Sequence, residues 1–346
     1  MPGQELRLLS LDGGGVRGLS TLFILQALMQ RINPDNPPKP CDYFDMIGGT
    51  STGGLIAIML GRLRMSVREC IEAYTELASK VFVKEHLLPA KKLWKLHRAK
   101  LRARFSSEVL KQCICDVLQK SQRSADELLK DTLPMSCKVC VFATSTGTST
   151  PVAIRSYPPA READDMYQTT KIWEAGRATS AASTFFDAIK IGPHKQEFTD
   201  GGTGANNPIQ YLWNEAQDLY TPDSRLEDHL ACIVSIGTGR PTFKEFGDDL
   251  ADLADTMVRI ATQTEETAEL FHQRNRHLAQ SGKYFRFNVG DGLGEIGLDE
   301  AAKVGQIKDR TDKYLGEEVN FERLSRCAKA LEVSEKSDEL TYQQCT

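Results

Sequence analysis

Two stretches near the start of the chain share one pattern: an apolar run ends in a cluster of glycines, and a helix-like apolar segment follows. The first is ELRLLSLDGGGVRG with LSTLFILQALMQRI after it, and the second is YFDMIGGTSTGGLIAIMLGRL. Apolar runs that end in glycine turns indicate buried strands, and apolar residues at helical spacing predict helices. Two strand, turn and helix units in succession predict an α/β fold with parallel strands.

The rest of the chain continues this alternation of strands and helices. Ser66 and Glu69 have the spacing of a capping box, which predicts a helix over VRECIEAYTELASKVF. Further strands are expected at KVCVFAT, VAIRSY, EFTD, ACIVSIG and KYFRFNV, and a helix from Asp248 to about Gln280. Residues 1–330 are expected to form a single domain, and the polar residues 331–346 a tail or linker.

The composition is that of an ordinary globular protein, with 40% hydrophobic and 26% charged residues. The formal net charge of -4 gives no support for a nucleic-acid partner. Nine cysteines, an odd number, and the lack of a signal segment argue against a secreted disulfide framework and predict a cytoplasmic protein. The apolar run LIAIML is far shorter than the ~20 residues of a membrane span, so membrane contact is expected to be peripheral.

Residues 49–53 read G-x-S-x-G and lie between an expected strand and an expected helix. In this context the motif predicts a nucleophile elbow, a strained turn that exposes its serine at the carboxyl end of a strand. Gly49 and Gly53 provide the space that such a turn requires. Ser51 is therefore the candidate nucleophile, and a plain glycine and serine turn is the alternative.

The earlier glycine cluster, DGGGVRG, supports two interpretations. It fits G-x-G-x-x-G after a strand, which is typical of a dinucleotide-binding loop. Consecutive glycines also gather backbone N–H groups into one concavity, so Gly13, Gly14 and Gly15 can form an oxyanion hole, and the elbow that follows favours this second interpretation. Arg17 and Gly18 are expected to support the loop, or Arg17 to meet a substrate phosphate; a plain surface arginine is the alternative.

A serine nucleophile needs a base. The six histidines are His86, His97, His194, His229, His272 and His277. None lies in a catalytic motif, and only His194 is close to an expected strand end. Asp200 ends the short strand EFTD and precedes two glycines, but aspartate is a poor base at its ordinary pKa of ~3.9 unless the site raises that pKa or stabilises the oxyanion strongly.

The motifs DGGGVRG, GTSTGG and DGG, in this order and at these intervals, resemble the three signature motifs of patatin-like acyl hydrolases. GRATSAASTFF is also similar to the family's helix between the elbow and the aspartate, and the resemblance covers about Leu6 to Thr238. It implies a three-layer sandwich in which helices flank a central, mostly parallel sheet. It also implies a serine lipid acyl hydrolase, phospholipase A-like or a nonspecific esterase, without metal or organic cofactor.

The resemblance assigns roles to particular residues. Ser51 would be the nucleophile and Asp200 its base in a dyad, with the amides of the glycine loop as oxyanion hole. The expected partner is a phospholipid or other acyl lipid, and the resemblance implies that other domains can adjoin the catalytic one. A nucleotide-binding module that uses GGGVRG and an esterase with His194 in a triad remain the alternatives.

Residues 91–105, KKLWKLHRAKLRARF, carry seven lysines and arginines and no acidic residue. Leucines, Trp94 and Phe105 are interleaved with them, a pattern that can rest on an anionic lipid surface. A nucleic-acid interpretation lacks an accompanying fold signature, and a solvated helix flank is the remaining alternative. The segment is expected to give the protein transient contact with membranes.

Overall fold

The computed structural model describes residues 5–83, 105–133, 136–160, 165–183, 185–240, 264–290 and 292–332. The strands in these ranges are β1 (Leu6–Leu11), β2 (Met46–Thr50), β3 (Lys138–Ser145), β4 (Thr150–Arg155), β5 (Ile189–Ile191), β6 (Gln196–Asp200), β7 (Leu230–Ile236) and β8 (Tyr284–Phe287). They form one sheet in the order β5, β6, β3, β2, β1, β7 and β8, with β4 also paired to β3.

The longer helices are α1 (Gly18–Ile32), α4 (Val67–Val81), α5 (Ser107–Lys120), α9 (Ile209–Tyr220), α12 (Val304–Gly316) and α13 (Glu318–Leu331). The shorter ones are α2 (Pro40–Tyr43), α3 (Thr52–Ala57), α6 (Asp165–Thr169), α7 (Ile172–Thr179), α8 (Gly202–Ala205) and α11 (Arg276–Gln280), and residues 264–274 are also helical. A π-helical turn, Ile58–Arg62, continues α3, and single 3-10 turns cover Gly15–Arg17, Leu226–His229, Leu293–Glu295 and Ala301–Lys303.

The sheet is mixed but mostly parallel. Strands β3, β2, β1, β7 and β8 pair in parallel, whereas β4 and β6 are antiparallel to β3, and β5 is antiparallel to β6. The predicted α/β fold and the expected strands are confirmed, and the three-residue β5 is an addition that the sequence pattern did not indicate. The helix expected from Asp248 is described only from residue 264, and it is interrupted at residue 275.

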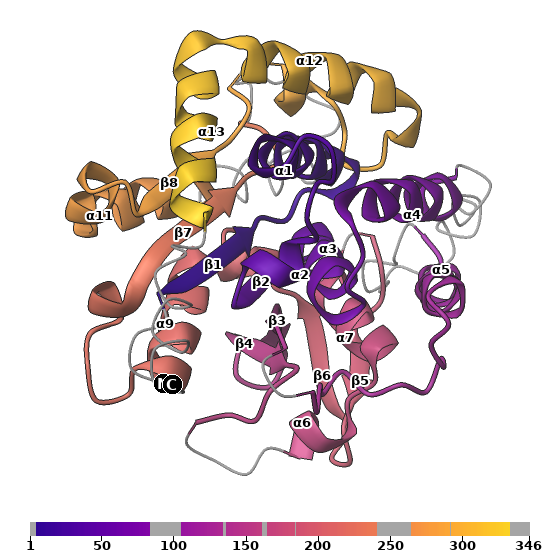
Figure 1. Ribbon diagram of the computed structural model, residues 1–346. Helices are drawn as coiled ribbons and strands as arrows, with labels where there is room; N and C mark the ends of the chain where they lie inside the picture. Colours follow the sequence, from indigo (N-terminus) through magenta and orange to yellow (C-terminus); the bar gives the residue numbers. More distant parts are fainter. Residues whose placement is uncertain are drawn as a thin grey trace, which may run out of the picture.

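Helices cover both faces of the sheet, so the predicted three-layer arrangement is confirmed. Side chains alternate along β1: Leu9 and Leu11 belong to a large core under one group of helices, and Leu8 belongs to a smaller core on the opposite face. Figure 1 shows α1, α4, α12 and α13 on the first side and α9 on the second. None of the helices in the described ranges combines the length and the apolar character that crossing a bilayer would require.

The helix α4 begins with the predicted capping box. The Ser66 hydroxyl accepts from the Glu69 amide at 3.3 Å, and the Ser66 amide donates to Glu69 Oε2 at 2.7 Å. This fixed start orients one apolar face of α4, including Tyr74 and Leu77, toward the core.

The C-terminal end of the described chain bears on the expected domain boundary. At the end of α13, Leu331 is completely buried, so the core extends at least to this residue. Residues 333–346 of the expected tail lie outside the described part, as do residues 91–104 of the basic segment.

Candidate functional site

One edge of β3 is shared by two strands, and this brings residues 51 and 200 together. Strand β4 pairs along the other edge, over residues 140–145. On the shared edge, β2 pairs as far as Thr50, which lies opposite Phe142. The next residue of β3, Ala143, lies opposite Asp200, the last residue of β6. Ser51 follows Thr50, so the chain leaves β2 at the point where β6 ends with Asp200.

The turn at Ser51 is strained, as a nucleophile elbow requires. Ser51 has φ 54 and ψ -123, a conformation that residues with a side chain rarely adopt. A Cβ at Gly49 would lie 2.1 Å from the Gly53 carbonyl oxygen, and one at Gly53 would lie 2.3 Å from the Leu11 carbonyl oxygen. Both positions predicted to need glycine therefore have no room for a side chain, and α3 starts directly after the serine.

Thr179, at the end of α7, occupies the position that β2 vacates beside β3. Its hydroxyl accepts a hydrogen bond from the Ser51 amide at 2.8 Å and donates one to the Phe142 carbonyl at 2.8 Å. The threonine thus replaces the missing strand neighbour and fixes the backbone of the elbow. Sequence patterns mark the segment around Thr179 but not this residue, because its partners are defined only by the strand register.

Asp200 is 8% exposed and lines the same cavity as Ser51. The Gly202 amide donates to Asp200 Oδ1 at 2.6 Å. Burial raises the pKa of Asp200 to about 7, and the interactions of its carboxylate with the Ser51 side chain and the Gly202 amide act in the opposite direction. The carboxylate can therefore accept a proton near neutral pH, which an ordinary aspartate does poorly.

The glycine loop lines the cavity beside Ser51, but its three amides are not equivalent. The Gly13 amide donates to the Asn206 carbonyl at 3.0 Å, so the prediction that it faces an oxyanion needs correction. Within the described residues, the amides of Gly14 and Gly15 have no protein acceptor. These two N–H groups remain as candidate oxyanion donors.

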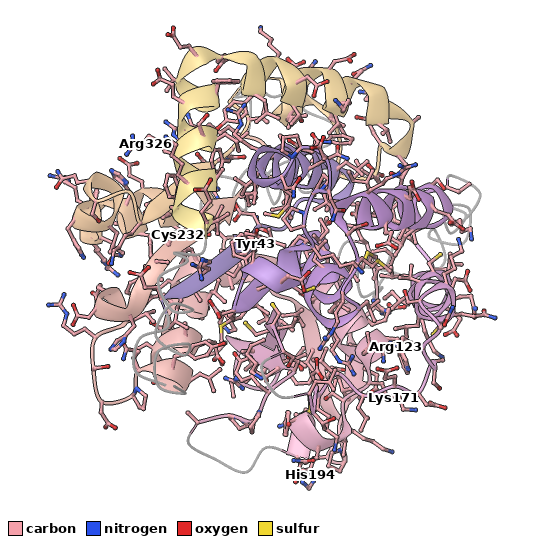
Figure 2. All side chains as sticks on the ribbon, in the orientation of Figure 1. Tyr43, Arg123, Lys171, His194, Cys232 and Arg326 are labelled. Carbon is pink, nitrogen blue, oxygen red and sulfur yellow. The ribbon has the colours of Figure 1, made fainter. Side chains whose placement is uncertain are left out.

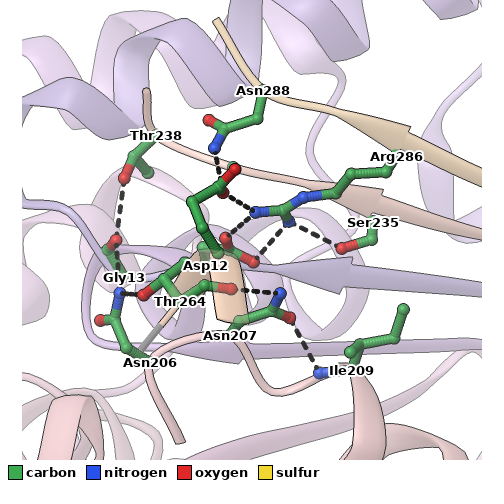
Figure 3. A network of polar contacts seen from close by, with 12 residues as sticks. Asp12, Gly13, Asn206, Asn207, Ile209, Ser235, Thr238, Thr264, Arg286 and Asn288 are labelled. Atoms are coloured by element: carbon green, nitrogen blue, oxygen red, sulfur yellow. Dashed lines mark hydrogen bonds and ion pairs between the residues drawn. The ribbon is translucent and has the colours of Figure 1, made fainter. Parts of the chain in front are cut away.

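The direction of the Gly14 amide follows from contacts of the Gly13 carbonyl. Thr238 Oγ1 donates to that carbonyl at 2.9 Å, and Asn206 Nδ2 donates to it at 3.3 Å (Figure 3). In a planar trans peptide the N–H points away from the C=O. The Gly14 N–H is therefore directed away from Thr238 and Asn206.

The loop is anchored by a buried ion pair that the sequence analysis did not identify. Asp12, which is completely buried, receives two hydrogen bonds from the Arg286 guanidinium, at 3.0 and 2.6 Å (Figure 3). Arg286 also donates to Ser235 Oγ at 2.8 Å. The two residues of the pair are 274 positions apart, so no local pattern relates them.

Arg17 is 9% exposed and lines the cavity, which rules out a plain surface arginine. Within the described part of the chain, its guanidinium has no hydrogen-bond or ion-pair partner, and burial lowers its pKa to about 10, so it remains cationic at neutral pH. A Cβ at Gly18 would lie 2.0 Å from Thr52 Cγ2, so this glycine allows α1 to approach the elbow. Tyr74 supports the loop by donating to the Gly15 carbonyl at 2.9 Å.

The cavity has a volume of about 180 Å³, with the polar groups described above on one side. Its other walls are apolar and come mainly from α4, α5 and the segment after α7. These side chains are Leu55, Leu77, Val81, Phe82, Leu110, Phe185, Phe186 and Leu298. The candidate nucleophile, the candidate base and an apolar pocket therefore share one space.

The structure does not bring His194 to Ser51. The His194 side chain is 76% exposed, its Nε2 lies 3.5 Å from Asp165 Oδ2, and Figure 2 shows it at the outer edge of the molecule beside α6. None of the histidines in the described ranges lines the cavity. His86 and His97 lie outside these ranges.

Phe105 departs from its expected role in membrane contact. It is 3% exposed, with ring centroids 5.3 Å from Phe82 and 6.0 Å from Phe185. The only described residue of the basic segment therefore packs in the core beside the cavity, because its ring completes an aromatic cluster.

Comparisons with known proteins bear on this site. The family model for patatin-like phospholipase matches residues 9–213. Calcium-independent phospholipase A2-gamma of Oryctolagus cuniculus is 31% identical to this chain over 348 residues, covering 95% of the chain and 40% of that protein. Phospholipase A I of Arabidopsis thaliana is 29% identical, covering 87% of the chain and 26% of that protein. The chain thus spans less than half the length of these two curated relatives.

Among solved structures, the chain is similar to VipD from Legionella pneumophila. The TM-score is 0.40 at 13% identity, covering 90% of this chain and 67% of that one.

The substitution Thr179→Val tests the support of the elbow. It should lower the free energy of unfolding by about 1–3 kcal/mol, because the Ser51 amide and the Phe142 carbonyl lose a buried hydrogen-bond partner. Urea unfolding followed by circular dichroism measures this. Thr148→Val, at an exposed threonine, is the matched control, and equal stability of the two variants would contradict the assigned contact.

Proposed function

The chain belongs to the patatin-like phospholipase family, and from this premise we propose that it is a serine hydrolase of lipid acyl esters. One observation carries the proposal: the strand register brings Ser51 and Asp200 to neighbouring positions beside β3, and both line one largely apolar cavity. The names of the curated relatives, which are phospholipases, support the same reaction class. A phospholipase A-like activity is the form we favour over a nonspecific esterase.

In the proposed mechanism, Ser51 Oγ attacks the carbonyl carbon of the ester while Asp200 accepts its proton. The negative charge that develops on the carbonyl oxygen is stabilised by the amides of Gly14 and Gly15, whose N–H groups are preorganised and need no rearrangement. The tetrahedral intermediate expels the alcohol or lysolipid, which takes the proton from Asp200. Water then attacks the acyl-enzyme and gives a proton to Asp200. The second tetrahedral intermediate releases the fatty acid as Ser51 Oγ takes that proton back from Asp200, which restores the free enzyme.

A dyad without histidine is chemically reasonable here. General-base catalysis is most efficient when the pKa of the base lies near the working pH, and the pKa of Asp200 is raised to about 7. The N-terminus of α3 adds a partial positive charge next to Ser51. Both effects favour loss of the serine proton, so a third residue is not required.

Two features of the cavity support a phospholipid as substrate. The apolar walls contributed by α4 and α5 suit an acyl chain, because they offer no polar group that would lose hydrogen bonds to water. The buried guanidinium of Arg17, which has no hydrogen-bond or ion-pair partner among the described residues, suits a phosphate group. We propose the acyl chain against the apolar walls and the phosphate near Arg17.

The setting of this reaction is part of the proposal. Residues 1–330, expected as a single catalytic domain, would be joined in it by the buried Leu331; the polar residues that follow, to 346, would be a tail or linker, and other domains would be able to adjoin the catalytic one. The protein would act in the cytoplasm, in transient contact with membranes through residues 91–104. No cofactor, metal or nucleic acid takes part in the proposed chemistry.

The alternatives are less well supported. For a nucleotide-binding module, the Gly13 amide should be available to a phosphate, but it is bonded to Asn206. For a triad, His194 should approach Ser51, but it lies in solvent beside Asp165.

Covalent labelling tests the proposed roles. A fluorophosphonate should label the wild-type protein at Ser51 and should not label Ser51→Ala, and the rate of labelling should fall by about 10²–10⁴-fold in Asp200→Asn, which cannot accept the proton. Mass spectrometry identifies the modified residue, and gel fluorescence gives the rate.

Ser180→Ala is the matched control for this labelling, because Ser180 lines the same cavity and its hydroxyl has no hydrogen-bond partner in the part of the chain that the structure describes. It should be labelled like the wild type. Labelling of Ser51→Ala at the wild-type rate would overturn the assignment of the nucleophile.

The pH dependence of hydrolysis tests the base. Asp200 must be ionised to accept the Ser51 proton, and its pKa is raised to about 7, so kcat/KM should increase about tenfold per pH unit below this value and level off above it. Initial rates with a p-nitrophenyl fatty-acid ester, between about pH 5 and about pH 9, measure the profile. A profile that is flat through neutral pH would contradict a base whose pKa lies near 7.

A further inference from the structure

A second cavity, of about 480 Å³, lies at the carboxyl ends of β7 and β8. Its lining comes from Arg240, which follows β7, from residues 288–290, which follow β8, and from α12 and α13. Figure 1 shows these two helices packed together near the ends of the two strands. The crevice outside the carboxyl ends of parallel strands is the usual place for a ligand in an open α/β sheet, and a volume between roughly 300 and 1,000 Å³ is typical of ligand pockets.

The charge of this cavity is opposite to that of the whole chain. Five lining residues are cationic, and Glu317 is the single carboxylate among the described lining residues. The cations are Arg240, Arg286, Arg310, Lys313 and Arg323. The complete chain has a formal net charge of -4, so this concentration of positive charge is local.

Two of these cations have no carboxylate partner in the described part of the chain. Lys313, exposed on α12, has no ion pair. Arg323 on α13 donates to the Asn320 side chain, a neutral group, at 3.2 Å. The Glu317 carboxylate accepts from Asn320 Nδ2 at 2.8 Å. The wall formed by α12 and α13 therefore carries positive charge that no described carboxylate neutralises.

Two glycines after β8, Gly290 and Gly292, line the rim of the cavity and leave room for the Arg310 guanidinium. Gly292 has φ 83, and a Cβ there would lie 1.7 Å from Arg310 Nη1, so any other residue would displace this arginine. A Cβ at Gly290 would meet nothing within 4 Å. Arg310 is held at the rim by Glu295 at 3.2 Å.

The cavity is a neighbour of the Ser51 site but separate from it, since the two share no lining residue. Glu265, which lines the Ser51 cavity, forms the boundary by pairing with Arg240 at 2.9 Å and accepting from Asn288 Nδ2 at 2.6 Å. Arg286 contacts Glu265 as well as Asp12. An anion in the second cavity would thus lie close to the ion pair that anchors the glycine loop.

We propose that the second cavity binds a phosphate-bearing anion through Lys313, Arg323 and Arg310. Guanidinium groups bind phosphate oxygens in a planar, bidentate fashion, and an ammonium group adds a point charge. The side chains of Asn288 and Asn320 also line this space, where Asn288 is bonded to Glu265 and Asn320 accepts from Arg323. The proposal does not depend on the hydrolase activity, because it concerns binding at residues outside the Ser51 cavity.

The test uses sodium pyrophosphate as the probe and isothermal titration calorimetry of the full chain. Saturable binding is expected for the wild type, and Lys313→Ala and Arg323→Ala should each weaken it by about tenfold or more, because each removes a charged hydrogen-bonding group. Lys308→Ala is the matched control, since Lys308 is on the same helix α12, pairs with Asp312 and does not line the cavity. It should bind like the wild type.

Thermal unfolding of each variant separates lost binding from lost structure, and Lys313→Ala is decisive because its exposed side chain makes no contact that the fold needs. Absence of saturable pyrophosphate binding, or equal binding by Lys313→Ala and Lys308→Ala, would overturn the proposal.

A second arm distinguishes a lipid headgroup from a soluble phosphate. Phosphatidylcholine vesicles with and without phosphatidic acid are sedimented with the protein in the presence and absence of pyrophosphate. Binding that needs phosphatidic acid, depends on Lys313 and is displaced by pyrophosphate identifies a headgroup. Calorimetric binding of pyrophosphate without such displacement identifies a soluble ligand.

Discussion

Along one edge of β3, strand β2 gives way to β6 between Phe142 and Ala143, and the proposed chemistry depends on this exchange. A continuous β2 would leave no room for Asp200, and a β6 shifted by one residue would turn its carboxylate to the opposite face of the sheet. The strained backbone at Ser51 is the local consequence, because the chain must leave the sheet within one residue. Thr179 stabilises this turn, because its hydroxyl bonds to the Ser51 amide and to the Phe142 carbonyl of β3.

The glycine loop depends on a second constraint, the buried pair of Asp12 and Arg286. Removing one partner of such a pair costs about 3–5 kcal/mol, because the other charge is left without compensation. Asp12 directly precedes the loop, and the carbonyl of the next residue is held by Thr238 and Asn206. These contacts determine which way the Gly14 amide points, so the candidate oxyanion donors are oriented by residues far away in the sequence.

Much of the fold could be predicted because its signals are local. The glycine clusters mark the ends of β1 and β2, apolar spacing marks α1 and α4, and Ser66 with Glu69 marks the start of α4. The motif order also singled out Ser51 and Asp200, which the structure brings together.

The features that the sequence analysis missed arise from pairings between distant segments. Arg286 lies in no sequence motif, and nothing distinguishes Thr179 within the segment that contains it. The contacts of both residues depend on how distant strands pair. Nothing in the sequence distinguishes the Gly13 amide from those of Gly14 and Gly15, because its acceptor, the Asn206 carbonyl, is remote in the chain. Phe105 resembled a membrane-facing residue because its aromatic partners at Phe82 and Phe185 are remote in sequence.

The central claim is that Ser51, Asp200 and two loop amides surround one reacting carbon, and a crystal structure of the fluorophosphonate adduct tests it most directly. We expect phosphorus to be bonded to Ser51 Oγ, with the phosphoryl oxygen about 2.7–3.1 Å from the nitrogens of Gly14 and Gly15. The Asp200 carboxylate should lie beside Ser51 Oγ. A phosphoryl oxygen that points away from both amides, or an adduct on another residue, would contradict it.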